Sequence, residues 1–274
     1  MSQPAGAPGA EGALVTAMWS WAAYVLEPAR ALRRLRPPAP VPPGPRPGLG
    51  PRFSRSDPQP RLLAGPTGHH HLVAEFDRLS EVYDAYVRPF STPIFAEART
   101  VLAPLLPGDA RVLDAGCGPG RELVGVARRV PQGEVVGVDL AAGMVQTAYR
   151  AARAAGCDNT AFVQADVADL PADFAGAFDL VYSCLAHHHY PEPARAAAAV
   201  RRCLRPGGAY AVVDAGPAWY ARLAAPLARA GDPGWMGFHT PAGFAALLDG
   251  AGFVEVAWYD LLPGFGIALG RAPG

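Results

Sequence analysis

Short apolar runs alternate with longer Ala-, Leu- and Arg-rich stretches of helical periodicity from residue 72 to the end of the chain. An apolar run without polar alternation predicts a strand buried on both faces, and strands separated by helices predict parallel pairing. The pattern therefore predicts an α/β domain in which helices cover both faces of a mostly parallel sheet.

The first 68 residues do not follow this pattern. They contain 14 of the 30 prolines, and ten of these lie among the 24 residues 37–60. Proline removes a backbone donor and disfavours helix in the residue before it, so no packed element is expected there. We therefore predict a disordered Pro/Arg-rich tail over residues 1–68 and a folded domain over residues 69–274.

One apolar stretch, residues 13–26, lies within this tail and predicts a short helix at 13–27. The stretch is shorter than the roughly 20 residues that span a bilayer. Its Arg-rich flank, residues 30–36, lies on the wrong side for a secretory signal. A helix that lies weakly on a membrane surface through residues 13–36 and an ordinary frayed helix both remain open.

The charge of the chain is balanced overall, with 24 Arg, no Lys and 24 acidic residues. Residues 1–68 carry eight Arg and three acids, or +5, whereas residues 69–274 carry 16 Arg and 21 acids, or −5. A domain with an acidic balance lacks the basic footprint of nucleic-acid binding, so no nucleic-acid partner is expected. The four cysteines form no CxxC pair or dense framework and predict free thiols in a reducing, cytoplasmic location.

A glycine-rich turn follows the predicted short strand 111–113. It runs Asp-Ala-Gly-Cys-Gly-Pro-Gly over residues 114–120, before a helical pattern at 121–130. A strand that turns sharply into a helix while a ligand touches its backbone needs residues without Cβ. A dinucleotide fingerprint is GxGxxG, whereas Arg121 stands here at the position of the third glycine. Hydride transfer with NAD(P) is therefore the less favoured alternative.

The segment 112–120, VLDAGCGPG, resembles the first motif of the class I S-adenosylmethionine (SAM)-dependent methyltransferases, a Rossmann-like family. Later landmarks follow in the order that this family implies: strands ending at Asp139 and Asp166, a fourth strand at 178–183, and a turn at 204–208 into a fifth strand at 209–214. The resemblance implies a doubly wound, mostly parallel sheet closed by an antiparallel C-terminal hairpin, 253–259 with 265–270. It also implies SAM as the cofactor.

The resemblance assigns cofactor roles to residues of these landmarks. The glycines would approach the amino-acid end of the cofactor above Asp114, Asp139 would accept hydrogen bonds from the ribose, and Asp166 would contact the adenine edge. A plain helix cap at Asp166 and a plain surface role for Arg121 remain open. The implied cofactor-binding set is Asp114, Gly116, Gly118, Gly120, Arg121, Asp139, Leu140, Asp166, Val167 and Ser183.

Three consecutive histidines, His187, His188 and His189, follow the fourth strand, at the edge where ligands of open α/β sheets bind. They resemble a loop of methyltransferases related to ubiquinone and menaquinone C-methylation. Because imidazole titrates near neutral pH, they are candidate bases for a phenolic or enolic acceptor, with His188 slightly preferred. Helix capping by these residues remains open. No metal site is expected from the trio, because neighbouring side chains diverge.

An aromatic-rich insertion at 216–242 separates the fifth strand from a predicted helix at 243–250. In the family that the chain resembles, such an insertion commonly builds the acceptor pocket, and a helical lid with its own core remains open. With the leading helix at 76–86 and the histidine loop, it gives the predicted substrate pocket: Tyr83, Tyr190, Trp219, Trp235, Phe238 and His239.

We therefore expect transfer of a methyl group from SAM to O, C or N of a small aromatic, polyketide-like or quinone-like metabolite. Displacement from a sulfonium depends mainly on orientation and exclusion of water, so a base is optional. The alternatives are an inactive SAM-binding module that acts in interaction or membrane docking through its tail and, less favoured, an NAD(P)-dependent oxidoreductase.

Overall fold

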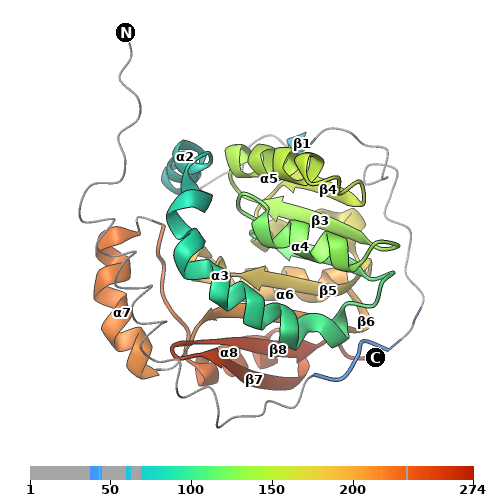
Figure 1. Ribbon diagram of the computed structural model, residues 1–274. Helices are drawn as coiled ribbons and strands as arrows, with labels where there is room; N and C mark the ends of the chain where they lie inside the picture. The colour runs from blue at the N-terminus through green and yellow to red at the C-terminus, as the bar shows by residue number, and fades with distance from the viewer. Residues whose placement is uncertain (1–37, 43, 45–59, 63–68, 217, 233) are drawn as a thin grey trace.

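The computed structural model describes residues 38–42, 44, 60–62, 69–216, 218–232 and 234–274. The predicted helix at 13–27 lies outside them. The described strands form one eight-stranded sheet in the order β1-β4-β3-β2-β5-β6-β8-β7 (Figure 1). They are β1 Arg61–Leu62, β2 Arg111–Ala115, β3 Glu134–Asp139, β4 Thr160–Gln164, β5 Phe178–Cys184, β6 Leu204–Ala215, β7 Val254–Leu262 and β8 Phe265–Arg271.

The sheet is parallel from β1 to β6, and β8 is antiparallel to both of its neighbours, β6 and β7. From β2 the chain proceeds outward to β3 and β4, then crosses back to place β5 on the other side of β2. The strand order therefore reverses between β2 and β5, which is where open α/β sheets bind ligands. The predicted doubly wound sheet with an antiparallel C-terminal hairpin is confirmed.

Helices cover both faces of the sheet (Figure 1). The helices α3, α4 and α5 pack on one face, with α2 against α5, while α6 and α8 pack on the other, and α7 lies at the side of the sheet. The α-helices are α2 His70–Leu79, α3 Tyr83–Leu102, α4 Arg121–Arg129, α5 Ala142–Ala154, α6 Pro193–Cys203, α7 Ala218–Gly231 and α8 Pro241–Gly250, and the short 3-10 helices are η3 Ala103–Leu105, η4 Val167–Asp169, η5 Ala172–Phe174 and η6 His187–His189.

Two hydrophobic cores lie on the two faces of the sheet. In β5, Leu180 and Tyr182 belong to the core under α3, α4 and α5, whereas Val181 belongs to the core under α6 and α8. In β7, Trp258 packs against one core and Tyr259 against the other, as their alternation predicts. The apolar runs are therefore continuous because each strand contributes side chains to both cores.

Two segments differ from the predicted elements. The leading helix is two helices, because residues 80–82 interrupt it between α2 and α3. The predicted turn at 204–208 lies within β6, where Leu204 pairs with Phe178 before an irregularity shifts the pairing to Ala209 with Leu180. Gly207, one of the extra β6 residues of this bulge, has a φ of +73°, which favours glycine.

Part of the predicted tail contacts the domain, and contrary to the expectation of no packed element there, residues 61–62 form β1, which pairs in parallel with β4. Residues 38–42 contain no helix or strand, yet Val41 is buried. Arg271 donates a hydrogen bond to the Ala39 carbonyl, and Arg205 donates one to the Pro42 carbonyl. A Pro-rich extended segment makes no internal backbone hydrogen bonds, so its carbonyl oxygens are available to accept from the two guanidinium groups.

Two further observations bear on the sequence predictions. All four cysteines are free, as predicted. Among the described residues, no helix has both the length and the apolar character that crossing a bilayer requires.

Candidate active site

The glycine turn between β2 and α4 is fixed by backbone geometry. Gly116, Gly118 and Gly120 have φ values of +78°, +50° and +81°. A Cβ on Gly116 would lie 2.7 Å from the Ala186 Cβ, and one on Gly120 would lie 2.7 Å from the Ala148 Cβ. A Cβ on Gly118 would meet nothing within 4 Å. The neighbouring side chains thus leave no room for a Cβ at Gly116 or Gly120. Gly118, between them, faces open space where a ligand can approach.

Asp114 lies beneath this turn. It is 2% exposed, and the Tyr182 hydroxyl donates a 2.7 Å hydrogen bond to its Oδ2. Burial raises its pKa to about 8, although the bond from Tyr182 acts in the opposite direction. The acid therefore connects the end of β2 to the middle of β5 below the ligand-facing surface.

Asp139, at the end of β3, connects the second strand of the site to the glycine turn. Its Oδ2 accepts a hydrogen bond from the Gly118 N–H at 2.8 Å, and its Oδ1 accepts one from the Ala141 N–H at 3.0 Å. Burial raises its pKa to about 6, and these backbone donors partly offset that effect. A carboxylate offers about four acceptor positions, so two remain for the ribose hydroxyls of a nucleoside.

Asp166 follows β4 and caps η4, where its Oδ1 accepts a 2.8 Å hydrogen bond from the Ala168 N–H. This is the cap that the sequence left open, and the second carboxylate oxygen is still available to an adenine edge. Val167 is buried beside it, and the Leu140 carbonyl accepts a 3.2 Å hydrogen bond from Gln164. These residues form the third side of the predicted nucleoside site.

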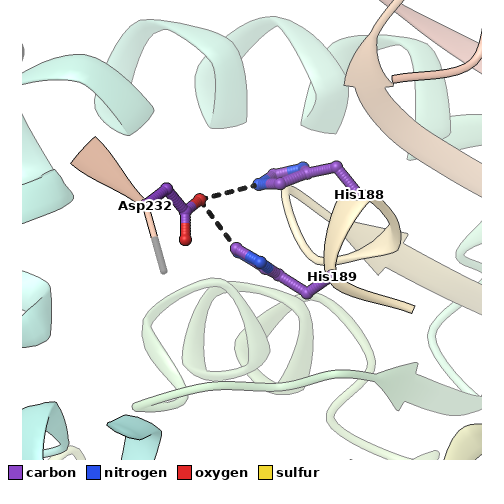
Figure 2. A group of neighbouring side chains, drawn as sticks. All are labelled: His188, His189 and Asp232. Carbon is purple, nitrogen blue, oxygen red and sulfur yellow. Dashed lines mark ion pairs between the residues drawn. The ribbon is translucent and has the colours of Figure 1, made fainter. Parts of the chain in front are cut away.

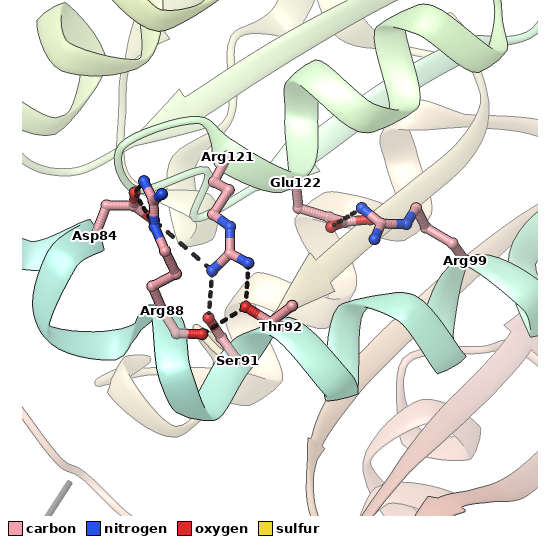
Figure 3. Close-up of polar contacts among 7 residues, drawn as sticks. All are labelled: Asp84, Arg88, Ser91, Thr92, Arg99, Arg121 and Glu122. Atoms are coloured by element: carbon pink, nitrogen blue, oxygen red, sulfur yellow. Dashed lines mark hydrogen bonds and ion pairs between the residues drawn. The ribbon is translucent and has the colours of Figure 1, made fainter. Parts of the chain in front are cut away.

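Arg121 begins α4, and its guanidinium bonds to the leading helix (Figure 3). It donates hydrogen bonds to the hydroxyls of Ser91 and Thr92 on α3, and its Nη1 lies 3.8 Å from a carboxylate oxygen of Asp84. The structure thus shows Arg121 tying α3 to the glycine turn. A bond from Arg121 to the cofactor carboxylate stays a prediction.

His188 and Asp214 form a tightly bonded pair at the ends of neighbouring strands. The Asp214 oxygens lie 2.9 and 3.0 Å from His188 Nδ1, and the His188 backbone N–H donates to Oδ2 at 3.0 Å. Burial alone lowers the pKa of His188, but the charge and hydrogen bond of Asp214, with the charge of Asp232, raise it above its ordinary value. Because Nδ1–H donates to Asp214, Nε2 keeps a lone pair that can accept a proton.

The other two histidines have different surroundings. His187 is 2% exposed and packs against Tyr190, His239 and Phe244, and burial lowers its pKa to about 3. His189 lies beside His188 with ring centres 4.1 Å apart, and burial lowers its pKa to about 4. Of the three candidate bases, His188 alone has a carboxylate within hydrogen-bond distance in the described part of the chain.

Ser183 and Tyr190 support the glycine turn. Their hydroxyl oxygens are 3.0 Å apart, and the Tyr190 hydroxyl donates a 2.7 Å hydrogen bond to the Ala115 carbonyl. A Cβ on Gly116 would lie 3.4 Å from the same hydroxyl. Ser183 is fully buried, so contact of its side chain with a cofactor stays a prediction, as does contact of Tyr190 with an acceptor.

The structure brings most of the predicted pocket aromatics to the histidine loop. Phe238 lies 5.5 Å from the His188 ring and 5.4 Å from Trp235, and His239 lies 5.2 Å from His187. Tyr83 packs against Phe76, which in turn packs against His189 of the loop. The ring centres are 5.8 Å apart in the first pair and 5.0 Å apart in the second. Trp219, on α7, is 50% exposed.

Three residues of the site were missed from the sequence: Asp214, Asp232 and Phe76. Asp214 stands near the end of β6, beside the end of β5, so its place next to the histidine loop follows from the order of parallel strands. Asp232 follows α7, and no local pattern places it beside His188 and His189. Phe76 belongs to a leading helix whose packing the sequence did not define.

The comparisons with known proteins agree with this geometry. A family model described as "Methyltransferase domain" matches residues 112–208. Nocamycin O-methyltransferase of Saccharothrix syringae is 35% identical over 209 residues, which are 66% of this chain and 71% of that protein. Trans-aconitate 2-methyltransferase of Deinococcus radiodurans is 35% identical over 161 residues, which are 54% of this chain and 59% of that protein.

The crystal structure of a SAM-dependent methyltransferase from Aquifex aeolicus matches with a TM-score of 0.56 at 16% identity and covers 73% of this chain and 97% of that one, a likeness that shows the fold. The glycine turn, the acids at successive strand ends and these relatives define a Rossmann-like methyltransferase. The chain belongs to the class I SAM-dependent small-molecule methyltransferases. Its cofactor is SAM.

Proposed function

We propose that the protein transfers the methyl group of SAM to an oxygen atom of a small, partly apolar phenol or enol, with His188 as the base. The observation that carries this proposal is the His188–Asp214 pair, with Nδ1 2.9 Å from Oδ1. The pair lies at the end of β5, next to the glycine turn, because Ala186 and Tyr190 of the same loop approach Gly116.

The cofactor, when bound, supplies an activated methyl group on a sulfonium whose leaving group is a neutral thioether. Gly118 and Asp139 fit that group, because Gly118 faces open space and Asp139 retains free acceptor positions. The chain then has to hold the acceptor oxygen in line with the methyl group and exclude water.

His188 handles the proton of the acceptor. Asp214 holds the proton on Nδ1, so that Nε2 points its lone pair toward the acceptor hydroxyl and receives the proton as the oxygen–methyl bond forms. The buried Asp214 carboxylate then stabilises the imidazolium. A raised pKa brings His188 closer to the pH of the cell and makes it a stronger base than His187 or His189.

The surroundings of His188 support the acceptor class. Phe238, Trp235 and Phe76 give the histidine loop apolar neighbours, which suits an acceptor with an aromatic or polyketide-like body. The two relatives above are named for small organic acceptors, one of them as an O-methyltransferase. This favours oxygen over the carbon and nitrogen acceptors that the sequence left open.

The test offers the full-length protein trideuteromethyl-labelled SAM and a panel of phenols, enols and carboxylic acids, and detects labelled products by mass spectrometry. We expect labelled ethers from the phenols or enols and binding of S-adenosylhomocysteine in a titration. Binding without any labelled product would favour an inactive SAM-binding module. Labelled products methylated on carbon alone would contradict the choice of oxygen.

A further inference from the structure

Three side chains of the types that bind metal ions converge at the histidine loop. His188 and His189 come from the loop after β5, and Asp232 comes from the segment after α7 (Figure 2). One ligand atom from each lies within 4.8 Å of the other two. His187 faces away, toward Phe244, so the three neighbouring histidines do not form a site of their own.

The spacing of these atoms does not fit direct hydrogen bonds. The Oδ2 atom of Asp232 is 3.9 Å from His188 Nε2 and 3.7 Å from His189 Nε2, and both distances exceed hydrogen-bond length. Both ring nitrogens of His189 are buried and have no hydrogen-bond partner among the described residues. The carboxylate and the two imidazoles thus face one another across a gap of atomic size.

A metal ion fits this gap. Zinc binds His nitrogen and carboxylate oxygen at about 2.0–2.2 Å, which places the ligand atoms of a tetrahedral site roughly 3.4 Å apart. A movement of a few tenths of an ångström by the Asp232 side chain closes the difference for the two observed carboxylate–imidazole distances, 3.7 and 3.9 Å, and the ligand atoms of the two imidazoles lie within 4.8 Å of each other.

The outer surroundings are also those of a metal site. A ligating histidine usually donates its other ring N–H to a carboxylate, which fixes the tautomer and directs the lone pair at the metal. Asp214 does this for His188, with both oxygens within 3.0 Å of Nδ1. The backbone N–H groups of Met236 and Gly237 donate to the His188 carbonyl and hold the segment after Asp232 against the loop.

We propose that His188, His189 and Asp232 bind one divalent transition-metal ion of the zinc class, and that this ion inhibits methyl transfer. Two imidazoles and one carboxylate favour zinc, cobalt or nickel over magnesium and calcium, which prefer oxygen ligands. The inhibitory part rests on the proposed function, because a bound ion occupies the Nε2 lone pair that otherwise takes the acceptor proton.

Binding is tested on the full-length protein without SAM or acceptor, so its result is independent of activity. Titration with Co²⁺ should give the visible absorption bands of a tetrahedral ion at one equivalent, and Zn²⁺ should displace it, whereas Mg²⁺ should not. Since His69, His70 and His71 are adjacent in sequence and could hold an ion on their own, all variants carry His→Gln at these three positions.

Three variants in that background separate this site from other ion binding. Asp232→Ala should weaken Co²⁺ and Zn²⁺ binding at least tenfold, and Asp214→Asn should weaken it 10–100-fold through the loss of the supporting carboxylate. Asp158→Asn, which removes a 91% exposed carboxylate away from the site, should leave binding unchanged. Equal Co²⁺ affinity in Asp232→Ala and its parent would overturn the metal site.

Activity then tests the inhibitory role. Zinc should inhibit wild-type methyl transfer at concentrations matching its measured dissociation constant, and chelation by EDTA should restore it. The half-inhibitory zinc concentration should rise at least tenfold in Asp232→Ala. Stimulation by zinc would refute inhibition while leaving the metal site intact, and metal binding by a protein that methylates nothing would refute only the proposed function.

Discussion

The two halves of the active site are built differently. The donor side is the glycine turn with Asp114 and Asp139, and the acceptor side is the histidine loop with its aromatic neighbours. On the donor side, the Gly118 N–H and the carboxyl groups of Asp114 and Asp139 each make at least one hydrogen bond within the chain. On the acceptor side, His187, His189 and Trp235 account for five of the nine buried side-chain nitrogen and oxygen atoms that have no hydrogen-bond partner among the described residues. An unpaired buried polar group costs about 1–3 kcal/mol, so the protein tolerates a local loss of stability there.

This difference matches what each half has to do. The donor side is predicted to bind a single cofactor, through groups whose positions follow from the strand ends and the turn. The acceptor side presents imidazole nitrogens and aromatic rings to a ligand that completes their hydrogen bonding. Substitutions on the donor side should therefore change cofactor affinity or stability, and substitutions on the acceptor side should change turnover.

The largest expected effect is on the acceptor side, at His188. His188→Ala should lower kcat by about 10²–10⁴-fold, because it removes the base that takes the acceptor proton. The dissociation constant for S-adenosylhomocysteine should change less than about twofold, because His188 bonds to no residue of the glycine turn. Steady-state kinetics and calorimetry measure the two quantities, with His71→Ala on the exposed face of α2 as the matched control. Full turnover by His188→Ala would remove it from the mechanism.

On the donor side, the strongest effect on stability is expected at Gly120. A Cβ there would lie 2.7 Å from the Ala148 Cβ at a φ of +81°, so Gly120→Ala combines backbone strain with overpacking. We expect a loss of about 2–5 kcal/mol in the free energy of unfolding, measured by urea denaturation. Gly118→Ala is the matched control: it bears the strain but no clash and should cost about 1–2 kcal/mol. Equal losses in the two variants would contradict the packing argument.

Glu122, on α4 behind the glycine turn, gives the donor side a pH dependence (Figure 3). Burial raises its pKa from 4.5 to about 7, although Arg99 and Arg121 act in the opposite direction. Because the folded-state pKa is above the unfolded one, the contribution of Glu122 to stability is fully present below about pH 4.5 and is lost as pH rises through 7.

Glu122→Gln cannot ionise and should lack this loss. The free energy of unfolding of the variant, relative to wild type, should therefore rise by about 3 kcal/mol between pH 4.5 and 8, as measured by urea denaturation at several pH values. Glu81→Gln, whose side chain is 76% exposed, is the control and should follow the wild-type curve. A difference that does not change with pH would show that Glu122 is charged throughout.

The smallest effect should appear in cofactor affinity at the nucleoside end. Asp139→Ala removes the acceptor of the ribose hydroxyls and should weaken S-adenosylhomocysteine binding by about 1–3 kcal/mol, or roughly 5–150-fold, in calorimetry. Asp166→Ala should weaken it less, because Asp166 is predicted to make one hydrogen bond to the adenine edge, whereas Asp139 is predicted to accept hydrogen bonds from both ribose hydroxyls. An unchanged affinity in Asp139→Ala would place the nucleoside elsewhere.

The donor side was largely predictable from the sequence. The apolar runs, the GxGxG spacing and the acids at 139 and 166 predicted the sheet, the turn and the strand ends, and each of these is local in the chain. The sequence did not show that the three glycines have different roles. Packing requires glycine at 116 and 120, because a Cβ there would clash with Ala186 and Ala148, which are distant in sequence. The caps and strand ends differ from prediction by only a few residues.

The acceptor side could be predicted only in composition. The sequence showed three histidines and an aromatic insertion, but the order of parallel strands places Asp214 beside His188, and the chain after α7 brings Asp232 to the same point. The contacts of residues 38–42 with Arg205 and Arg271 are equally long in range. Local patterns thus determined that this chain folds as a doubly wound sheet with a glycine turn after its first central strand. The tertiary structure alone decided which histidine has a carboxylate partner, because that depends on side chains meeting across strand ends and loops.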